Sequence, residues 1–196
     1  MTVPAGVAVP RGDSSTWATP LDTTLLATLV QACLYAPADP RATTVQRGQR
    51  LEDLMSWLIA HLPGFVVRQR NVWSASRAQE VDLVVWNEQH PAGFASFGNK
   101  ILVECKNTGY KVDSSDVAWF DWKLRLGGVD EGILVAARGI TGDPQLRTAA
   151  HDIIMLANVE KRHIMVVQLD DIARLTCTED LRNLLIDSQL GLATRS

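Results

Sequence analysis

The apolar positions of the chain recur at two spacings, one typical of helices and the other of strands. Over residues 21–35 and 48–62, large apolar side chains return every three or four positions, which predicts two helices with one buried face each. Short runs rich in β-branched residues predict five strands, over 65–72, 81–86, 101–106, 132–137 and 164–169. A loop over 87–99, which contains Pro91 and two glycines, joins the second and third strands into a hairpin.

Further helices are expected after the third strand, over 114–126, from Asp143 to about Val159, after Asp170 and over 178–190. Their starts carry the Ser, Asp and Pro residues that favour a first turn, and Gly127-Gly128 ends the first of them. A hairpin-connected start followed by alternating helices and strands predicts an α/β fold. We expect a central mixed sheet with helices on both faces.

The pattern also divides the chain into a short N-terminal part and a main domain. Residues 1–45 are predicted to hold a loose arm, rich in Pro, Gly, Ser and Thr, and the extra helix over 21–35. Residues 46–196 are predicted to form the main domain with its C-terminal helices. The extra helix either packs on the main domain or lies between subunits.

Composition narrows the class of protein only slightly. The chain has 196 residues and a net charge of -3, which argues against a broad basic surface that coats nucleic acid but allows a local basic groove. The three cysteines are widely spaced and odd in number, so no disulfide framework is expected. With no signal peptide and no membrane-crossing run apparent, we expect a cytoplasmic protein that does not bind a membrane.

Charged residues interrupt the second and third predicted strands, where buried strands rarely hold them. Because alternate side chains of a strand share a face, Glu104 and Lys106 point the same way, with Cys105 opposite as a small buried residue. Asp82 lies on the polar face of the preceding strand. If the two strands pair, Asp82, Glu104 and Lys106 converge at one end of the sheet.

Two carboxylates at that separation repel each other unless a positive charge lies between them. A hard divalent cation removes the conflict, and Mg2+ prefers a few carboxylates together with water and phosphate. The adjacent Lys106 would position or deprotonate a water molecule. An alternative is that the Glu-x-Lys tripeptide is simply a solvated strand edge.

Asp82 followed by Glu104-Cys105-Lys106 on the next strand resembles the signature of the PD-(D/E)XK, or restriction-endonuclease-like, nucleases. The surroundings resemble the Mrr-type and Holliday-junction-resolvase-like branch, in which a helix with a glutamate precedes the first strand; Glu52 occupies that position here. Val81 stands where the family has a proline. The likeness extends from about residue 47 to 175 and implies an αβββαβ core.

The resemblance implies a metal-dependent endonuclease that hydrolyses phosphodiester bonds in DNA, in restriction, phage defence or repair. It implies that Asp82, Glu104 and the backbone carbonyl of Cys105 hold Mg2+, for which Mn2+ can substitute. Lys106 and Glu52 would complete the catalytic set. A homodimer is expected because two strands need two cuts, and a partner protein could supply targeting. The alternative is a catalytically silent module that binds nucleic acid or assembles with a protein.

Several side chains near this set have ordinary alternatives. Glu52 could be a solvated helix residue paired with Arg50 or Arg68. The resemblance suggests Lys123 as a basic residue near the metal, but a solvated lysine is the favoured interpretation. Trp119 and Trp122 could stack on bases, although tryptophans at helical spacing more often belong to a core or an interface.

Overall fold

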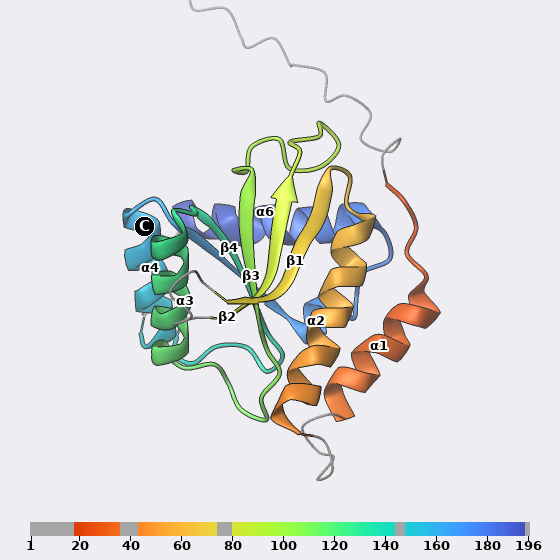
Figure 1. Ribbon diagram of the computed structural model, residues 1–196, viewed down its shortest axis with the longest axis horizontal. Helices are drawn as coiled ribbons and strands as arrows, with labels where there is room; N and C mark the ends of the chain where they lie inside the picture. The colour runs from red at the N-terminus through yellow and green to blue at the C-terminus, as the bar shows by residue number, and fades with distance from the viewer. Residues whose placement is uncertain (1–17, 36–42, 74–79, 144–147, 195–196) are drawn as a thin grey trace, which may run out of the picture.

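The computed structural model describes residues 18–35, 43–73, 80–143 and 148–194. The chain forms one five-stranded sheet with helices on both sides (Figure 1). Its elements are α1 (Thr23–Tyr35), α2 (Thr44–His61), β1 (Phe65–Trp73), β2 (Glu80–Asn87), β3 (Lys100–Lys106), α3 (Ser114–Gly127), β4 (Glu131–Ala136), α4 (Ala150–Val159), β5 (His163–Gln168), α5 (Leu169–Ile172) and α6 (Thr178–Thr194). The α/β class and the mixed sheet are therefore confirmed.

The strands lie in chain order, from β1 at one edge to β5 at the other. β1, β2 and β3 pair antiparallel, whereas β3, β4 and β5 pair parallel. In the antiparallel half the loop over 88–99 joins β2 to β3, and the parallel half is joined by α3 and α4, as parallel pairing requires. β3 is the middle strand and belongs to both halves.

Alternate strand residues supply two separate cores, one on each face of the sheet. On one face α1, α2, α5 and α6 cover Leu83, Val103 and Val135, which are fully buried. On the other face α3 and α4 cover Leu102 and Leu134. Figure 1 shows α3 and α4 on one side of the strands and α1 and α2 on the other. Side-chain alternation along β3 thus fixes which face each of its charged residues can reach.

The predicted hairpin loop between β2 and β3 is confirmed and folds back on the sheet. Phe94 and Phe97 are buried and lie against each other with ring centroids 4.7 Å apart. The buried Asn87 amide donates to the carbonyl of Phe94 at 2.8 Å. This loop closes the sheet end opposite to Lys106.

The helix predicted from Asp143 begins later, at Ala150, so that boundary was wrong. Residues 143 and 148 instead close a loop, in which the Asp143 amide donates to the Thr148 hydroxyl and the Thr148 amide donates to the Asp143 carbonyl. Gly142 and Ala149 flank this loop at φ 97° and 53°, conformations that no helix continues through. Pro144 lies outside the described residues.

Helix α1 packs on the main domain rather than standing apart from it. Leu26, Val30 and Cys33 are buried in the same core as α2. The segment before α1 is tied to the segment before α6, since the Leu21 amide donates to the Thr176 carbonyl at 2.9 Å. Residues 1–17 of the predicted arm lie outside the described residues. No described helix combines the length and the apolar character needed to cross a membrane.

Candidate active site

Asp82 and Glu104 face each other at the carboxyl end of β3. The antiparallel pairing of β2 with β3 places Leu83 opposite Val103. The next position along each strand is Asp82 on β2 and Glu104 on β3, so the register brings the two carboxylates together. The structure therefore brings these two side chains together, and their role as a site stays a prediction.

The Asp82 carboxylate is held against the backbone of β3. It accepts a hydrogen bond from the Cys105 N–H at 2.6 Å. Burial and, to a smaller extent, the neighbouring Glu104 carboxylate raise the pKa of Asp82 to about 7, since the hydrogen bond from Cys105 offsets only part of their effect. The site therefore concentrates negative charge that the surrounding protein does not fully compensate.

Two lysines bind the Glu104 carboxylate. The Lys123 ammonium lies 2.6 Å from one Glu104 oxygen, and the Lys106 ammonium lies 3.3 Å from the other. Lys106 also lies 3.1 Å from the Asp116 carboxylate. The side chains of Lys123 and Glu104 are each only 5% exposed, so this pair is buried, whereas Lys106 is 22% exposed. Lys106 is thus the lysine that meets solvent.

The charge state of Lys106 follows from its neighbours. Burial lowers the pKa of its ammonium, but the carboxylates of Glu104 and Asp116 more than offset this effect, and the net shift is upward. Lys106 is therefore protonated at neutral pH. In this arrangement it can donate hydrogen bonds and supply positive charge, but it cannot accept a proton.

The burial of Lys123 overturns the favoured interpretation of a solvated lysine. Lys123 lies three positions after Phe120, whose side chain is fully buried, so both residues face the sheet. That spacing was the available sequence signal for its burial. Asp116, on the same helix, was also missed as a partner of Lys106.

Glu52 reaches the site region from α2, on the other side of β3. It is 8% exposed, and its nearest ionic partner is Arg70 of β1, at 3.6 Å, rather than Arg50 or Arg68. Its Oε2 atom accepts no hydrogen bond from the described residues. Its charge contributes to the raised pKa of Asp82, so Glu52 belongs to the same electrostatic cluster. The solvated interpretation of Glu52 is therefore wrong.

The helix layer is tied to the end of β3 by Asn107. Its side-chain amide donates to the carbonyls of Cys33 and Arg47, at 3.3 and 2.9 Å. These contacts join the residue after Lys106 to the last turn of α1 and the first turn of α2. The position of Glu52 relative to Asp82 is thus set by direct contacts with the end of β3.

At this point the described residues offer oxygen ligands for a metal ion, but their side chains do not form a complete ligand set. No group of three or more His, Cys, Asp or Glu side chains within the described ranges is arranged to hold a metal ion. The Cys105 N–H points toward Asp82, and the N–H and C=O of one strand residue point to the same side. The Cys105 carbonyl therefore faces the edge of β3 at which Asp82 lies.

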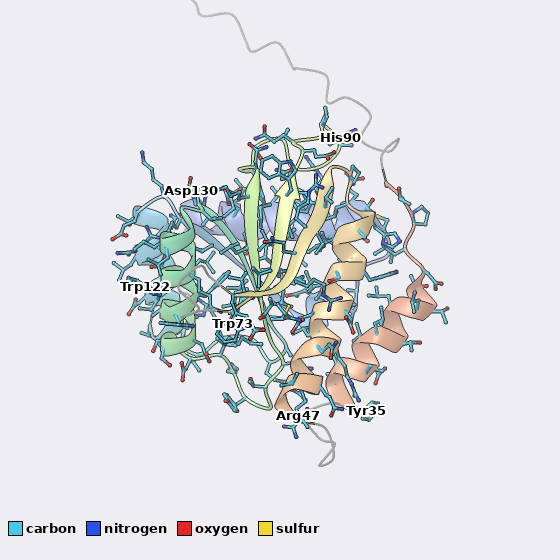
Figure 2. The ribbon with its side chains drawn as sticks, viewed as in Figure 1. Tyr35, Arg47, Trp73, His90, Trp122 and Asp130 are labelled. Atoms are coloured by element: carbon cyan, nitrogen blue, oxygen red, sulfur yellow. The ribbon has the colours of Figure 1, made fainter. Side chains whose placement is uncertain are left out.

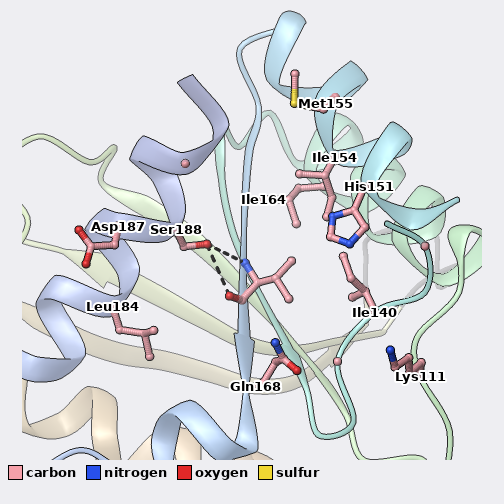
Figure 3. A pocket seen from close by; sticks show the side chains of 14 residues that line it. Lys111, Ile140, His151, Ile154, Met155, Ile164, Gln168, Leu184, Asp187 and Ser188 are labelled. Atoms are coloured by element: carbon pink, nitrogen blue, oxygen red, sulfur yellow. Dashed lines mark hydrogen bonds between the residues drawn. The ribbon is translucent and has the colours of Figure 1, made fainter. Parts of the chain in front are cut away.

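A cavity lined by described residues lies elsewhere, beside the edge strand β5 (Figure 3). It has a volume of about 490 Å³, and its walls include Ile140, His151 and Ile164. The Ser188 hydroxyl of α6 accepts a hydrogen bond from the Val166 amide at 3.1 Å and so covers part of the free edge of β5. None of the four predicted catalytic residues lines this cavity.

Comparisons with protein-family models, with curated proteins and with solved structures each found no match. The resemblance to the nucleases therefore depends on the chain's own residues and on their arrangement. That arrangement is a pair of carboxylates on neighbouring strands with a lysine beside them.

Proposed function

We propose that this protein is a metal-dependent phosphodiesterase that cuts DNA at the carboxyl end of β3. One observation carries the proposal. Asp82 and Glu104 meet on adjacent strands, and Lys106, two residues after Glu104, lies 3.3 Å from its carboxylate. Paired carboxylates with an adjacent cation are suited to transferring a phosphoryl group to water.

The donors present fit Mg2+ in chemistry. Asp82, Glu104 and the Cys105 carbonyl would supply hard oxygen ligands, and Mg2+ commonly takes one or two carboxylates and completes its shell with water and phosphate. Burial is the main cause of the raised pKa of Asp82, and a bound cation would also remove the repulsion by Glu104 that adds to it. Mn2+ prefers the same kinds of ligand and would substitute.

When bound, the cation would polarise the phosphate and lower the pKa of a coordinated water. The protonated Lys106 would orient the attacking water by hydrogen bonding and offset the charge that develops on the phosphate. Glu52 would position water near Asp82, because its carboxylate belongs to the same electrostatic cluster. Asp116 would keep Lys106 in place.

The two lysines on Glu104 favour a second candidate, a silent module that binds nucleic acid or a protein without cleaving. In that case Lys123 and Lys106 neutralise Glu104 permanently, and no cation is needed. The two candidates differ in one measurable property. An enzyme must bind a divalent cation through Asp82 and Glu104, whereas the silent module need not.

The test compares cleavage of supercoiled plasmid and of single-stranded DNA by the parent, Asp82→Asn, Glu104→Gln and Lys106→Ala, with Mg2+, Mn2+ or chelator. Lys111→Ala serves as the matched control, because Lys111 is an exposed lysine in the segment between β3 and α3. We expect cleavage that needs the metal and falls at least about a hundredfold in the three site variants. The Lys111 variant should cleave like the parent.

Calorimetric titration with Mg2+ separates the two candidates where no cleavage is seen. Binding by the parent that is lost in Asp82→Asn supports a metal site and points to a missing substrate. Absence of binding in the parent would favour the silent module. Equal cleavage by the parent and all three variants would show that the site is assigned to the wrong residues.

A further inference from the structure

Helix α3 exposes two tryptophans on the side of the candidate site. Trp119 is 46% exposed and Trp122 is 44% exposed, although indole rings usually bury most of their surface. Figure 2 shows Trp122 on α3, on the side of the fold away from α1 and α2. The inner face of the same helix is already covered, because Val117, Phe120 and Leu124 are fully buried. Neither tryptophan therefore belongs to the core.

The helical spacing places Trp119 one turn from two residues of the site. Asp116, Trp119 and Lys123 are separated by three and four positions, so they are neighbours along the helix, with their Cβ atoms about 5–6 Å apart from one to the next. Asp116 contacts Lys106, and Lys123 contacts Glu104. Trp122 lies one position before Lys123 and continues the exposed surface away from the sheet.

Access from solvent runs along the same surface. Asp116, Lys106 and Asp82 are partly exposed members of the site, while Lys123 and Glu104 are almost fully buried. A phosphate that reaches Lys106 from the side of Asp116 arrives one helical turn from Trp119. A protein partner bound to the two indoles would block the approach to Lys106. A nucleic-acid strand would instead contact the two indoles and Lys106 at the same time.

We propose that Trp119 and Trp122 form a stacking platform for unpaired bases, next to the phosphate that lies at Lys106. Proteins that bind single strands combine cationic groups along the backbone with aromatic rings on which bases stack. In a duplex the faces of the bases already stack on one another, so a platform of this kind selects single-stranded segments, flaps or extruded bases. This assignment of DNA with unpaired bases as the substrate class rests on the proposed function.

The test measures binding rather than cleavage. Fluorescence anisotropy in chelator compares labelled oligo(dT) with a duplex of equal length, using the parent, Trp119→Ala, Trp122→Ala and Trp119→Phe. Leu156→Ala, which removes an exposed apolar side chain from α4, is the matched control. Circular dichroism melts check that each variant is folded.

We expect each tryptophan-to-alanine change to weaken oligo(dT) binding about tenfold. Binding of the duplex should change less than about twofold, because its bases are not available to the rings. Trp119→Phe should keep most of the affinity, and Leu156→Ala should bind like the parent. Quenching of tryptophan fluorescence by oligo(dT) should decrease in both alanine variants.

Three outcomes would overturn the platform. They are no binding of oligo(dT) by the parent, equal losses for oligo(dT) and duplex, and unchanged affinity in both alanine variants. A fall in the molecular mass in solution of Trp119→Ala would also overturn it, since it would assign the surface to protein contact. Metal-dependent cleavage by the parent, together with unchanged oligo(dT) binding in the alanine variants, would reject the platform but keep the enzyme. Weaker oligo(dT) binding in those variants, without metal-dependent cleavage by the parent, would reject the enzyme alone.

Discussion

At the scale of single residues, the charge balance around Glu104 sets the chemistry of the site. Its carboxylate is shared by a buried lysine from α3 and a partly exposed lysine from its own strand. Across from it, Asp82 has a backbone N–H as its hydrogen-bond partner. A cation would therefore meet one carboxylate that is paired with two lysines and one that is partly protonated at neutral pH through its raised pKa.

Replacing Lys123 by methionine tests whether a cation can take over its charge. In chelator, Lys123→Met should lower the free energy of unfolding by about 3 kcal/mol, because a buried carboxylate loses its closest partner. Under the proposed function, Mg2+ should restore more stability to this variant than to the parent. Thermal melts with chelator and with Mg2+ measure both effects, and Lys111→Met is the control. A loss that Mg2+ leaves unchanged would favour the silent module.

The raised pKa of Asp82 predicts an unusual dependence of stability on pH. The folded protein holds a proton on Asp82 up to about pH 7, whereas the unfolded chain releases it near its ordinary value of 3.8. Between these values the folded state binds more protons, so the contribution of Asp82 lowers the free energy of unfolding as the pH rises. Above about pH 7 this contribution is constant.

Asp82→Asn removes this titration and keeps an acceptor for the Cys105 N–H. In chelator at pH 8, the variant should be more stable than the parent by on the order of 2–4 kcal/mol. The difference should shrink steadily as the pH is lowered to 5. Urea unfolding at several pH values measures it. A difference that does not vary with pH would show that Asp82 titrates normally in the folded state.

At the scale of elements, the close approach of α3 to the sheet brings Lys123 to Glu104. Gly132 of β4 makes this approach possible, since a Cβ atom there would lie 2.8 Å from the Leu124 side chain and 2.9 Å from the Phe120 ring. A second contact, from Arg162 to Asp121 of α3 at 2.7 Å, ties the helix to the turn after α4. Helix α3 is thus fixed both by packing and by an ion pair.

Gly132→Ala should push α3 away from the sheet. The overpacking should lower the free energy of unfolding by about 1–3 kcal/mol, and cleavage should fall because the contact between Lys123 and Glu104 lengthens. Gly109→Ala is the matched control, since no atom lies within 4 Å of the added carbon. Chemical denaturation and the plasmid assay provide the two measurements. Full stability in the variant would mean that the helix tolerates the displacement.

At the scale of the whole molecule, α1 and the sheet are joined in one core. The buried face of α1 packs with α2, and the side chain of Asn107 reaches the last turn of α1 from the end of β3. A chain built in this way should unfold in one cooperative step. The N-terminal helix then supports the candidate site indirectly, through α2 and Glu52.

Leu26→Ala tests this coupling, because Leu26 is only 2% exposed and lies on α1. The cavity should lower the free energy of unfolding of the entire domain by about 2–4 kcal/mol. Near-ultraviolet and far-ultraviolet circular dichroism should report the same shifted transition. Leu25→Ala, on the exposed side of the same helix, should change little. A main transition unaffected by Leu26→Ala would make α1 a separate unit.

The sequence by itself determined the elements and their buried faces. Short runs rich in β-branched residues predicted the five strands, and period-two alternation placed Glu104 and Lys106 on one face of β3 with Cys105 on the other. These features are local, because burial of one face imposes a spacing that neighbouring residues reveal. The start of α4 was missed because the turn signal at Asp143 belongs to a loop that closes on Thr148.

Only the tertiary structure decided the partner of each charged group. The strand register puts Asp82 opposite Glu104, the rotation of α3 buries Lys123 and exposes Trp119, and the course of β1 brings Arg70 to Glu52. Such pairings join residues far apart in the chain. Local periodicity indicates which face of an element is buried, as at Lys123, but the partner of each charged group depends on how helices and strands fit together in space.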